Sequence, residues 1–234
     1  MASDGLAGDP PPGSADRSAE PADAPADAPA APTDAPADPG TVRPGGRTAR
    51  VREAVLRAAG DLLAERGFAG LDLADVAQRA EVGKTTVYRR WGNTTGLVAD
   101  LLVDMAESSV SRADTGSLLG DLRANAHLVR RTLTDERQGA LFKAVIAAAT
   151  CDARTSEALH AFYATRIKEW APCVEAAIER GEAPPGTDPH EVIRAVSGPL
   201  YYRLLASGDP LDEASAERAA TAAAAAARAG AYVP

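Results

Sequence analysis

Residues Lys84–Trp91 combine hydroxyl, phenol and cationic side chains within one short segment. Val87 and Trp91 stand four residues apart, so a helix here buries both on one face. The remaining side chains then point outward, which suits insertion into a DNA major groove. An ordinary surface helix with a solvated charged face would have the same spacing. The outward set is Lys84, Thr85, Thr86, Tyr88, Arg89 and Arg90.

A second short helix is expected immediately before this one. Leu73, Val76, Ala77 and Ala80 recur at helical spacing, and Asp72 is placed to cap the helix at its N-terminus. The residues Glu81-Val82-Gly83 interrupt the pattern. The stretch 72–91 therefore predicts two helices joined by a three-residue turn, a helix–turn–helix.

The charge of the chain is unevenly distributed. The formal net charge is −8, of which residues 1–40 carry −7 and residues 41–234 carry −1. The first 40 residues repeat Pro-Ala-Asp, so residues 1–42 are expected to be a disordered tail. Five arginines follow in residues 41–60, beside the helix–turn–helix, as phosphate binding requires. They are Arg43, Arg47, Arg50, Arg52 and Arg57.

The rest of the chain predicts an all-α protein. Apolar residues recur every three or four positions, and strand patterns are almost absent. Pro172 is expected to kink or split one long helix, and Gly198-Pro199 to bend another. No apolar run approaches membrane-spanning length, and residues 1–40 lack the pattern of a secretory signal, so we expect a cytoplasmic protein with no membrane partner. The predicted helices are 48–66, 72–80, 84–91, 94–111, 117–133, 138–149, 153–181, 188–206 and 211–229.

The segment Arg50–Leu102 resembles the DNA-binding domain of the tetracycline-repressor (TetR) family. The similarity rests on VREAVLRAAGDLLAERGFAGLDLADVAQRA, VGKTTVYRRW and NTTGLVADLL. Residues 198–214, GPLYYRLLASGDPLDEA, are similar to a segment near the C-terminus in one branch of the same family. The resemblance implies a three-helix helix–turn–helix DNA-binding domain over residues 43–96. It also implies a helical effector-binding and dimerisation domain over residues 97–230.

The resemblance also assigns contacts to double-stranded DNA. An arginine at 89 or 90 can fork onto guanine, whereas Tyr88 and Lys84 suit phosphates. Four departures from the family pattern shift more of the affinity onto the arginine-rich arm. Glu81 stands in place of a small residue, Gly83 in place of a hydroxyl cap, Thr94 in place of a phosphate-binding lysine, and Ala74 in place of a polar contact. The expected DNA-binding residues are Arg43, Arg47, Arg50, Lys84, Thr85, Thr86, Tyr88, Arg89, Arg90, Thr94 and Thr95.

Two further sites follow from the resemblance. A small, apolar effector is expected in the C-terminal domain, although each candidate lining residue also fits a plain core position. A homodimer interface is expected on the last two helices, where an apolar stretch precedes an alanine-rich one; covering the protomer's own core is the alternative. The effector candidates are Met105, His127, Phe142, Phe162, Tyr163 and Trp170. The interface candidates are Leu200, Tyr201, Leu204 and Leu205.

The most direct interpretation is a homodimeric transcription regulator, a repressor that an effector releases from a palindromic operator. The alternative is a helical small-molecule-binding module or enzyme that no longer reads DNA, which only Glu81 and Thr94 favour. No catalytic residue, cofactor or metal site is expected, because nucleophile, phosphate-loop and metal-ligand motifs are lacking. Cys151 and Cys173 fit packing thiols better than a redox pair.

Overall fold

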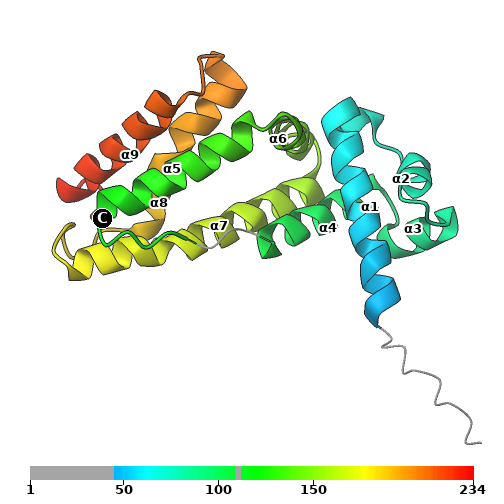
Figure 1. The fold of residues 1–234 in the computed structure, drawn as a ribbon, viewed down its shortest axis with the longest axis horizontal. Helices are drawn as coiled ribbons and strands as arrows, with labels where there is room; N and C mark the ends of the chain where they lie inside the picture. The colour runs from blue at the N-terminus through cyan, green and yellow to red at the C-terminus, as the bar shows by residue number, and fades with distance from the viewer. Residues whose placement is uncertain (1–44, 109–111) are drawn as a thin grey trace, which may run out of the picture. The chain divides into compact units, whose positions relative to one another are not determined.

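The computed structural model describes residues 45–108 and 112–234, so the predicted tail and Arg43 lie outside the described part of the chain. Within those ranges the chain forms nine α-helices, one 3₁₀ turn and one π-helical turn, without a strand (Figure 1). The all-α prediction is therefore confirmed. The elements are α1 (Gly45–Arg66), η1 (Phe68–Gly70), α2 (Leu73–Arg79), α3 (Lys84–Trp91), α4 (Thr94–Glu107), α5 (Leu118–Thr134), α6 (Glu136–Ala149), α7 (Ala153–Glu179), α8 (Pro189–Tyr202), η2 (Arg203–Ser207) and α9 (Glu213–Arg228).

Side-chain caps explain where most of these helices begin. Asp72 accepts a hydrogen bond from the backbone N–H of Ala74 at 2.6 Å, and Asn93 accepts one from Gly96 at 2.8 Å. Each cap satisfies an N–H that has no partner inside its helix. The other capping residues are Ser117, Asp135, Asp152, Asp188 and Asp212. Because caps are local in sequence, the predicted helix starts lie close to the observed ones.

Helices α1 to α4 share one apolar core. Helix α1 contacts α2 and α4, and α3 contacts both α2 and α4. Leu63, Val76, Val87 and Leu97 contribute side chains with 0% exposure. Burying four large aliphatic groups among short helices fixes their mutual orientation, because close-packed side chains leave few alternative arrangements.

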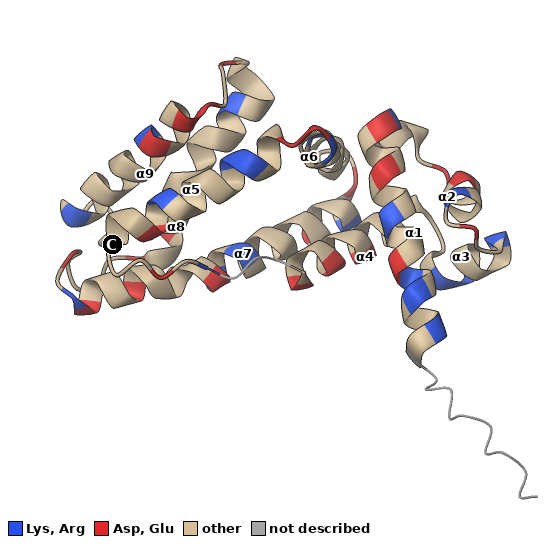
Figure 2. Cartoon of the chain, in the orientation of Figure 1, with Lys and Arg blue, Asp and Glu red and all other residues tan. Residues whose placement is uncertain are grey.

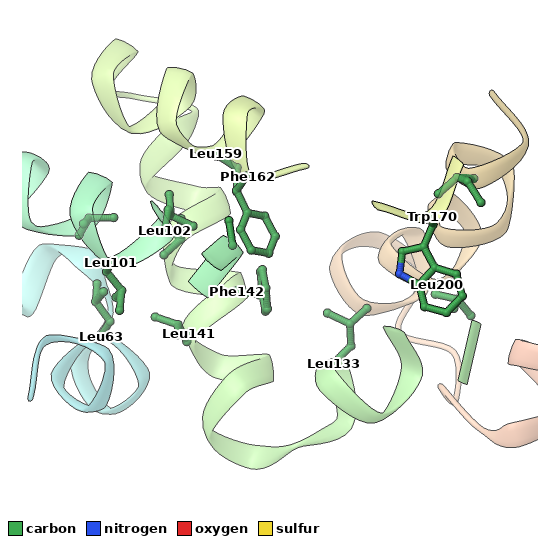
Figure 3. Packing of buried hydrophobic residues seen from close by; sticks show 14 of the residues in the cluster. Leu63, Leu101, Leu102, Leu133, Leu141, Phe142, Leu159, Phe162, Trp170 and Leu200 are labelled. Atoms are coloured by element: carbon green, nitrogen blue, oxygen red, sulfur yellow. The ribbon is translucent and has the colours of Figure 1, made fainter. Parts of the chain in front are cut away.

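Helices α5 to α9 form the second part of the packing. Helix α9 packs against α5 and α8, whereas α7 packs against α6, α8 and α4. The contacts of α4 with α7 and of α1 with α6 join this part to the first. Figure 3 shows the join, where Leu63, Leu101 and Leu141 lie together. No helix in residues 45–108 or 112–234 is both long and apolar enough to cross a membrane.

Both internal prolines lie within helices that continue past them. Helix α7 continues through Pro172 over 27 residues, so of the two expected outcomes, a kink or a split, the split is wrong. Tight packing around Trp170 and Cys173, which are 2% and 0% exposed, holds the helix together where one backbone hydrogen bond is missing. Helix α8 contains Pro199 and passes into the π-helical turn η2, which ends at Gly208 with a φ of 69°.

The cysteines are separate, free thiols. Cys151 is exposed and Cys173 is buried. Burial raises the pKa of Cys173 to about 12, so this thiol stays neutral and packs as a small apolar group. The packing interpretation therefore holds for Cys173 but not for Cys151. In the part of the chain that the structure describes, no group of three or more possible ligands is placed to hold a metal ion.

The turn between α2 and α3 contains the one positive φ that a described residue other than glycine adopts. Glu81 has a φ of 55°, which brings its Cβ close to its own backbone. Val82 follows it and donates its N–H to the carbonyl oxygen of Ala77 at 2.9 Å. The turn thus keeps its geometry although Glu81 is a poor residue for it.

Replacing Glu81 by glycine should raise the free energy of unfolding by up to about 1 kcal/mol, since the relieved strain exceeds the extra freedom of the unfolded chain. Urea unfolding followed by circular dichroism measures the change. Glu81→Gln removes the charge but keeps the strained backbone, so its stability should equal that of the parent. A glycine variant less stable than both would contradict the assignment of strain.

Replacing Gly96 by alanine should lower the stability by about 1–3 kcal/mol. A Cβ at this position would lie 2.4 Å from the carbonyl oxygen of Trp91, which is backbone and cannot rotate away. Gly46→Ala in α1 is the matched control, since its Cβ would have no neighbour within 4 Å. Thermal unfolding of the two variants should separate them, and equal midpoints would show that α4 adjusts to the extra methyl group.

Candidate nucleic-acid interface and internal cavity

Helix α3 presents the predicted outward face. Val87 and Trp91 are buried, with 0% and 6% exposure, and Tyr88 is 46% exposed. Lys84, Thr85, Arg89 and Arg90 are also exposed, whereas Thr86 is half-buried. The inward pair of the sequence prediction is therefore correct, and the face left outward is polar and cationic.

A carboxylate beneath α3 anchors it to two other helices. The indole Nε1 of Trp91 donates a hydrogen bond to Asp100 of α4 at 2.9 Å. Arg52 of α1 donates to the same carboxylate from Nη2 at 2.8 Å and from Nε at 3.2 Å. Burial alone would raise the pKa of Asp100, but the hydrogen bonds from Arg52 and Trp91 outweigh it and hold the pKa below its usual value. Asp100 therefore stays ionised and ties α3 to α1 and α4.

Two cations of α3, Lys84 and Arg89, differ from the arginines at the contact of α1 with α2 in forming no ion pair with a described residue. Arg66 of α1 pairs with Asp75 at 2.6 Å, and Arg79 of α2 pairs with Glu65 at 2.5 Å. Neither Lys84 nor Arg89 forms an ion pair with another described residue. Arg90 lies over the ring of Trp91, 5.1 Å from its centroid, which restrains it. Arg89 is thus the less restrained of the two candidates for reading a base.

Only part of the predicted arginine arm is available for DNA. Arg47 and Arg50 are exposed on α1 and form no ion pair with a described residue. Arg52 is committed to Asp100 and Asp104, and Arg57 to Glu53 at 2.6 Å. In Figure 2 the basic residues of α1 gather in its N-terminal half, and α3 has basic residues at both ends. The number of arginines available to bind phosphate is therefore smaller than the five counted in residues 41–60.

The start of α4 is partly occupied by the protein itself. Thr94 and Thr95 are half-buried, and the Thr95 hydroxyl bonds to Asp152, the cap of α7. Hydrogen bonds from Thr155, with a smaller contribution from Thr95, hold the pKa of Asp152 below its usual value. The Thr95 side chain therefore serves the contact with α7, which leaves its backbone N–H as the group that can meet a phosphate.

A cavity of about 350 Å³ lies among α5, α6, α7 and α8. This volume is in the range of small-molecule sites. Four of the six predicted effector residues line it: Phe142, Phe162, Tyr163 and Trp170. In Figure 3 the rings of Phe142 and Phe162 lie together, and the ring of Trp170 lies apart from them, beside Leu200.

Aromatic rings packed tilted or edge-to-face against one another form one wall of the cavity. The ring centroids of Phe142 and Phe162 are 5.6 Å apart, those of Phe162 and Tyr163 are 5.3 Å apart, and those of Tyr163 and Tyr201 are 5.5 Å apart. Burial raises the pKa of Tyr163 and of Tyr201, so both phenols stay protonated at neutral pH. The wall is therefore uncharged and rigid.

The other two effector candidates lie elsewhere. Met105 borders a smaller cavity between α1, α4 and α6, and His127 contacts Glu217 of α9 through Nε2 at 3.0 Å. His127 thus joins α5 to α9 and is not among the residues that line the cavity. Sequence reasoning missed Asn125, Arg166 and Tyr201 as lining residues. Asn125 was detectable as a polar residue on the apolar face of its helix.

The predicted dimer residues do not form one surface. Leu200 is 0% exposed and belongs to the core of its own protomer, so its assignment to the interface is wrong. Tyr201 lines the cavity, Leu204 is half-buried, and Leu205 is 47% exposed. Tyr202, at 63% exposure, had not been predicted. We define the α8–α9 face as the exposed residues Gly198, Pro199, Tyr202, Leu205, Ala214, Thr221, Ala222 and Ala225.

Comparison with known proteins gives the same assignment over both parts of the chain. Residues 55–101 match the family model for bacterial regulatory proteins of the tetR family, and residues 112–223 match that for the tetracyclin repressor-like C-terminal domain. The chain is 32% identical over 168 residues to YdeS of Bacillus subtilis, an uncharacterized HTH-type transcriptional regulator, covering 71% of this chain and 84% of that protein. It is 30% identical to the DNA-binding transcriptional repressor TetR of Mycobacteroides abscessus, covering 69% and 85%.

Among solved structures, the TetR family transcription regulator SCO0332 superposes with a TM-score of 0.62 at 30% identity. The match covers 75% of this chain and 97% of that one. Together with the anchored, outward-facing cations of α3, these similarities show that the chain belongs to the TetR family of DNA-binding transcriptional regulators.

Proposed function

We propose that the protein is a homodimeric repressor that binds a palindromic operator and is released from it by a small molecule. The observation that carries the DNA part is α3, whose unpaired cations Lys84 and Arg89 stand on a helix held by the Trp91–Asp100 hydrogen bond. A helix held in one orientation can keep a register on the duplex, whereas a mobile helix would bind DNA without a preferred register.

Two copies are proposed because one eight-residue helix reads too few base pairs. A two-fold dimer places two reading helices one helical turn apart on the DNA. The α8–α9 face supports this arrangement, since it exposes Tyr202 and Leu205 beside small residues of α9. Tyrosine and leucine beside small residues can pack closely against a symmetry mate.

Release is proposed to start in the cavity. Phe162 of α7 lines the cavity and also a groove that α4 and α7 form with each other. A ligand that displaces this ring would act on α4, which holds Asp100 and thus α3. The repressor role is proposed by analogy with the relative named as a transcriptional repressor. Recovery of genomic DNA fragments bound to the full chain, followed by footprinting, tests for a palindromic site.

Arg89→Ala should weaken binding to the specific site by about 1–3 kcal/mol and relax the preference at one base position. Lys84→Ala should weaken binding to specific and random DNA alike. It should also reduce the steepness of the plot of log binding constant against log salt concentration by about one. Gel-shift titrations at several salt concentrations measure both. If the two variants behave identically, the separation into a base-reading and a phosphate-binding residue is wrong.

Leu205→Glu should leave the protomer folded but weaken dimerisation by tenfold or more, because a buried carboxylate without a partner is costly. Sedimentation velocity measures the dimer, and operator affinity should fall in parallel. Val233→Glu is the control: Val233 is 40% exposed but lies outside the α8–α9 face. A Leu205→Glu variant that sediments as the parent dimer would place the interface elsewhere.

A further inference from the structure

Three buried polar atoms on residues that line the cavity have no hydrogen-bond partner in the part of the protein that the structure describes. They are the carbonyl oxygen Oδ1 of Asn125 on α5, the hydroxyl of Tyr163 on α7 and the indole Nε1 of Trp170 on α7. Asn125 and Trp170 are 4% and 2% exposed. Buried polar groups in proteins are almost always paired, so each of these atoms is suited to a partner that enters the cavity.

The Tyr163 hydroxyl can donate or accept and so places no fixed demand on a partner, whereas the atoms of Asn125 and Trp170 make opposite demands. An indole N–H can only donate, so Trp170 requires an acceptor, whereas the Asn125 oxygen requires a donor. In Figure 3 the nitrogen of Trp170 lies on the edge of its ring that faces Leu133 and Phe142. Water could satisfy the atoms of Asn125 and Trp170, and a ligand that reproduces both hydrogen bonds would displace that water without leaving either atom unpaired.

The rest of the lining favours an uncharged, ring-containing molecule. The wall of Phe142, Phe162, Tyr163 and Tyr201 offers edges and faces to a flat ring. Arg166 and Arg194 also border the cavity, but each donates to a glutamate of its own helix at 2.5 Å, Glu169 and Glu191 respectively. Because these guanidinium charges are already compensated, a ligand carboxylate would gain little from them and would lose its hydration.

We propose that the cavity binds an uncharged aromatic molecule that carries both an acceptor for Trp170 Nε1 and a donor for Asn125 Oδ1, as an aromatic amide does. This inference rests on the proposed function only in treating the cavity as the effector site. Of the side chains named here, Asn125 sets the requirement for a donor and Trp170 the requirement for an acceptor.

Three isosteric probes test the proposal on the full-length chain by equilibrium dialysis. 2-Naphthamide has a donor and an acceptor, 2-acetylnaphthalene keeps only the acceptor, and 2-naphthoate is the charged analogue. The amide should bind about tenfold tighter than the ketone, since the ketone leaves the Asn125 oxygen unpaired, and tighter still than the carboxylate. Equal binding of amide and ketone, tighter binding of the carboxylate, or binding of none of the three would overturn the proposal.

Two variants assign the contacts to residues. Asn125→Leu should abolish the preference for amide over ketone, because the ketone never used that oxygen. Trp170→Phe should weaken amide and ketone by the same factor, since both present the carbonyl to the indole. A change of cavity shape alone would not produce these two different patterns. Thermal unfolding checks that the variants fold. If one variant does not fold, the comparison of the three probes on the parent protein still tests the proposal.

A gel shift separates this proposal from the proposed function. Operator binding without any probe tests the regulator itself, and dialysis tests the cavity without DNA. If the amide binds with the expected preferences but leaves operator binding unchanged, the assigned ligand chemistry holds and release by a ligand is wrong.

Discussion

The ionised carboxylate of Asp100 is the constraint on which the reading surface depends. It receives hydrogen bonds from Trp91 of α3 and Arg52 of α1 while standing on α4, so one group joins three helices. Keeping a half-buried carboxylate ionised without these donors would be costly. The orientations of the three helices therefore depend on one another. Since α4 also packs against α7, the orientation of α3 is linked by direct contacts to the helices that enclose the cavity.

Internal pairing decides which cations remain available to a polyanion. Arg52, Arg66 and Arg79 hold helices of the reading domain together through ion pairs. Arg47, Arg50, Lys84 and Arg89 have no such partner among the described residues, and Glu81 adds a negative charge three residues before Lys84. Net charge therefore says little about the surface of such a protein, because arginines that cross-link its helices through ion pairs contribute less to the surface field than unpaired ones.

Local features of the fold could be predicted from sequence, and features that depend on partner surfaces could not. The inward pair Val87 and Trp91 and the Asp72 cap follow from spacing within one turn of helix. Periodicity also placed Leu200 on an apolar helix face. It cannot tell whether the protomer itself or a second copy covers that face, and the structure shows that the protomer covers Leu200. Likewise, the separation of His127 from the cavity depends on Glu217, which lies 90 residues away in sequence.

The alanine content of α9 has a consequence for the entropy of association. Alanine has no side-chain rotamers, so covering Ala214, Ala222 and Ala225 immobilises nothing beyond the backbone that the helix already fixes. Longer side chains at the same positions would each lose rotamer freedom on contact. The same residues expose little apolar area, so they gain little by being covered. In the proposed dimer such a surface would have a low entropic barrier and a weak driving force, and its affinity would be set by the few large side chains at its margin, Tyr202 and Leu205.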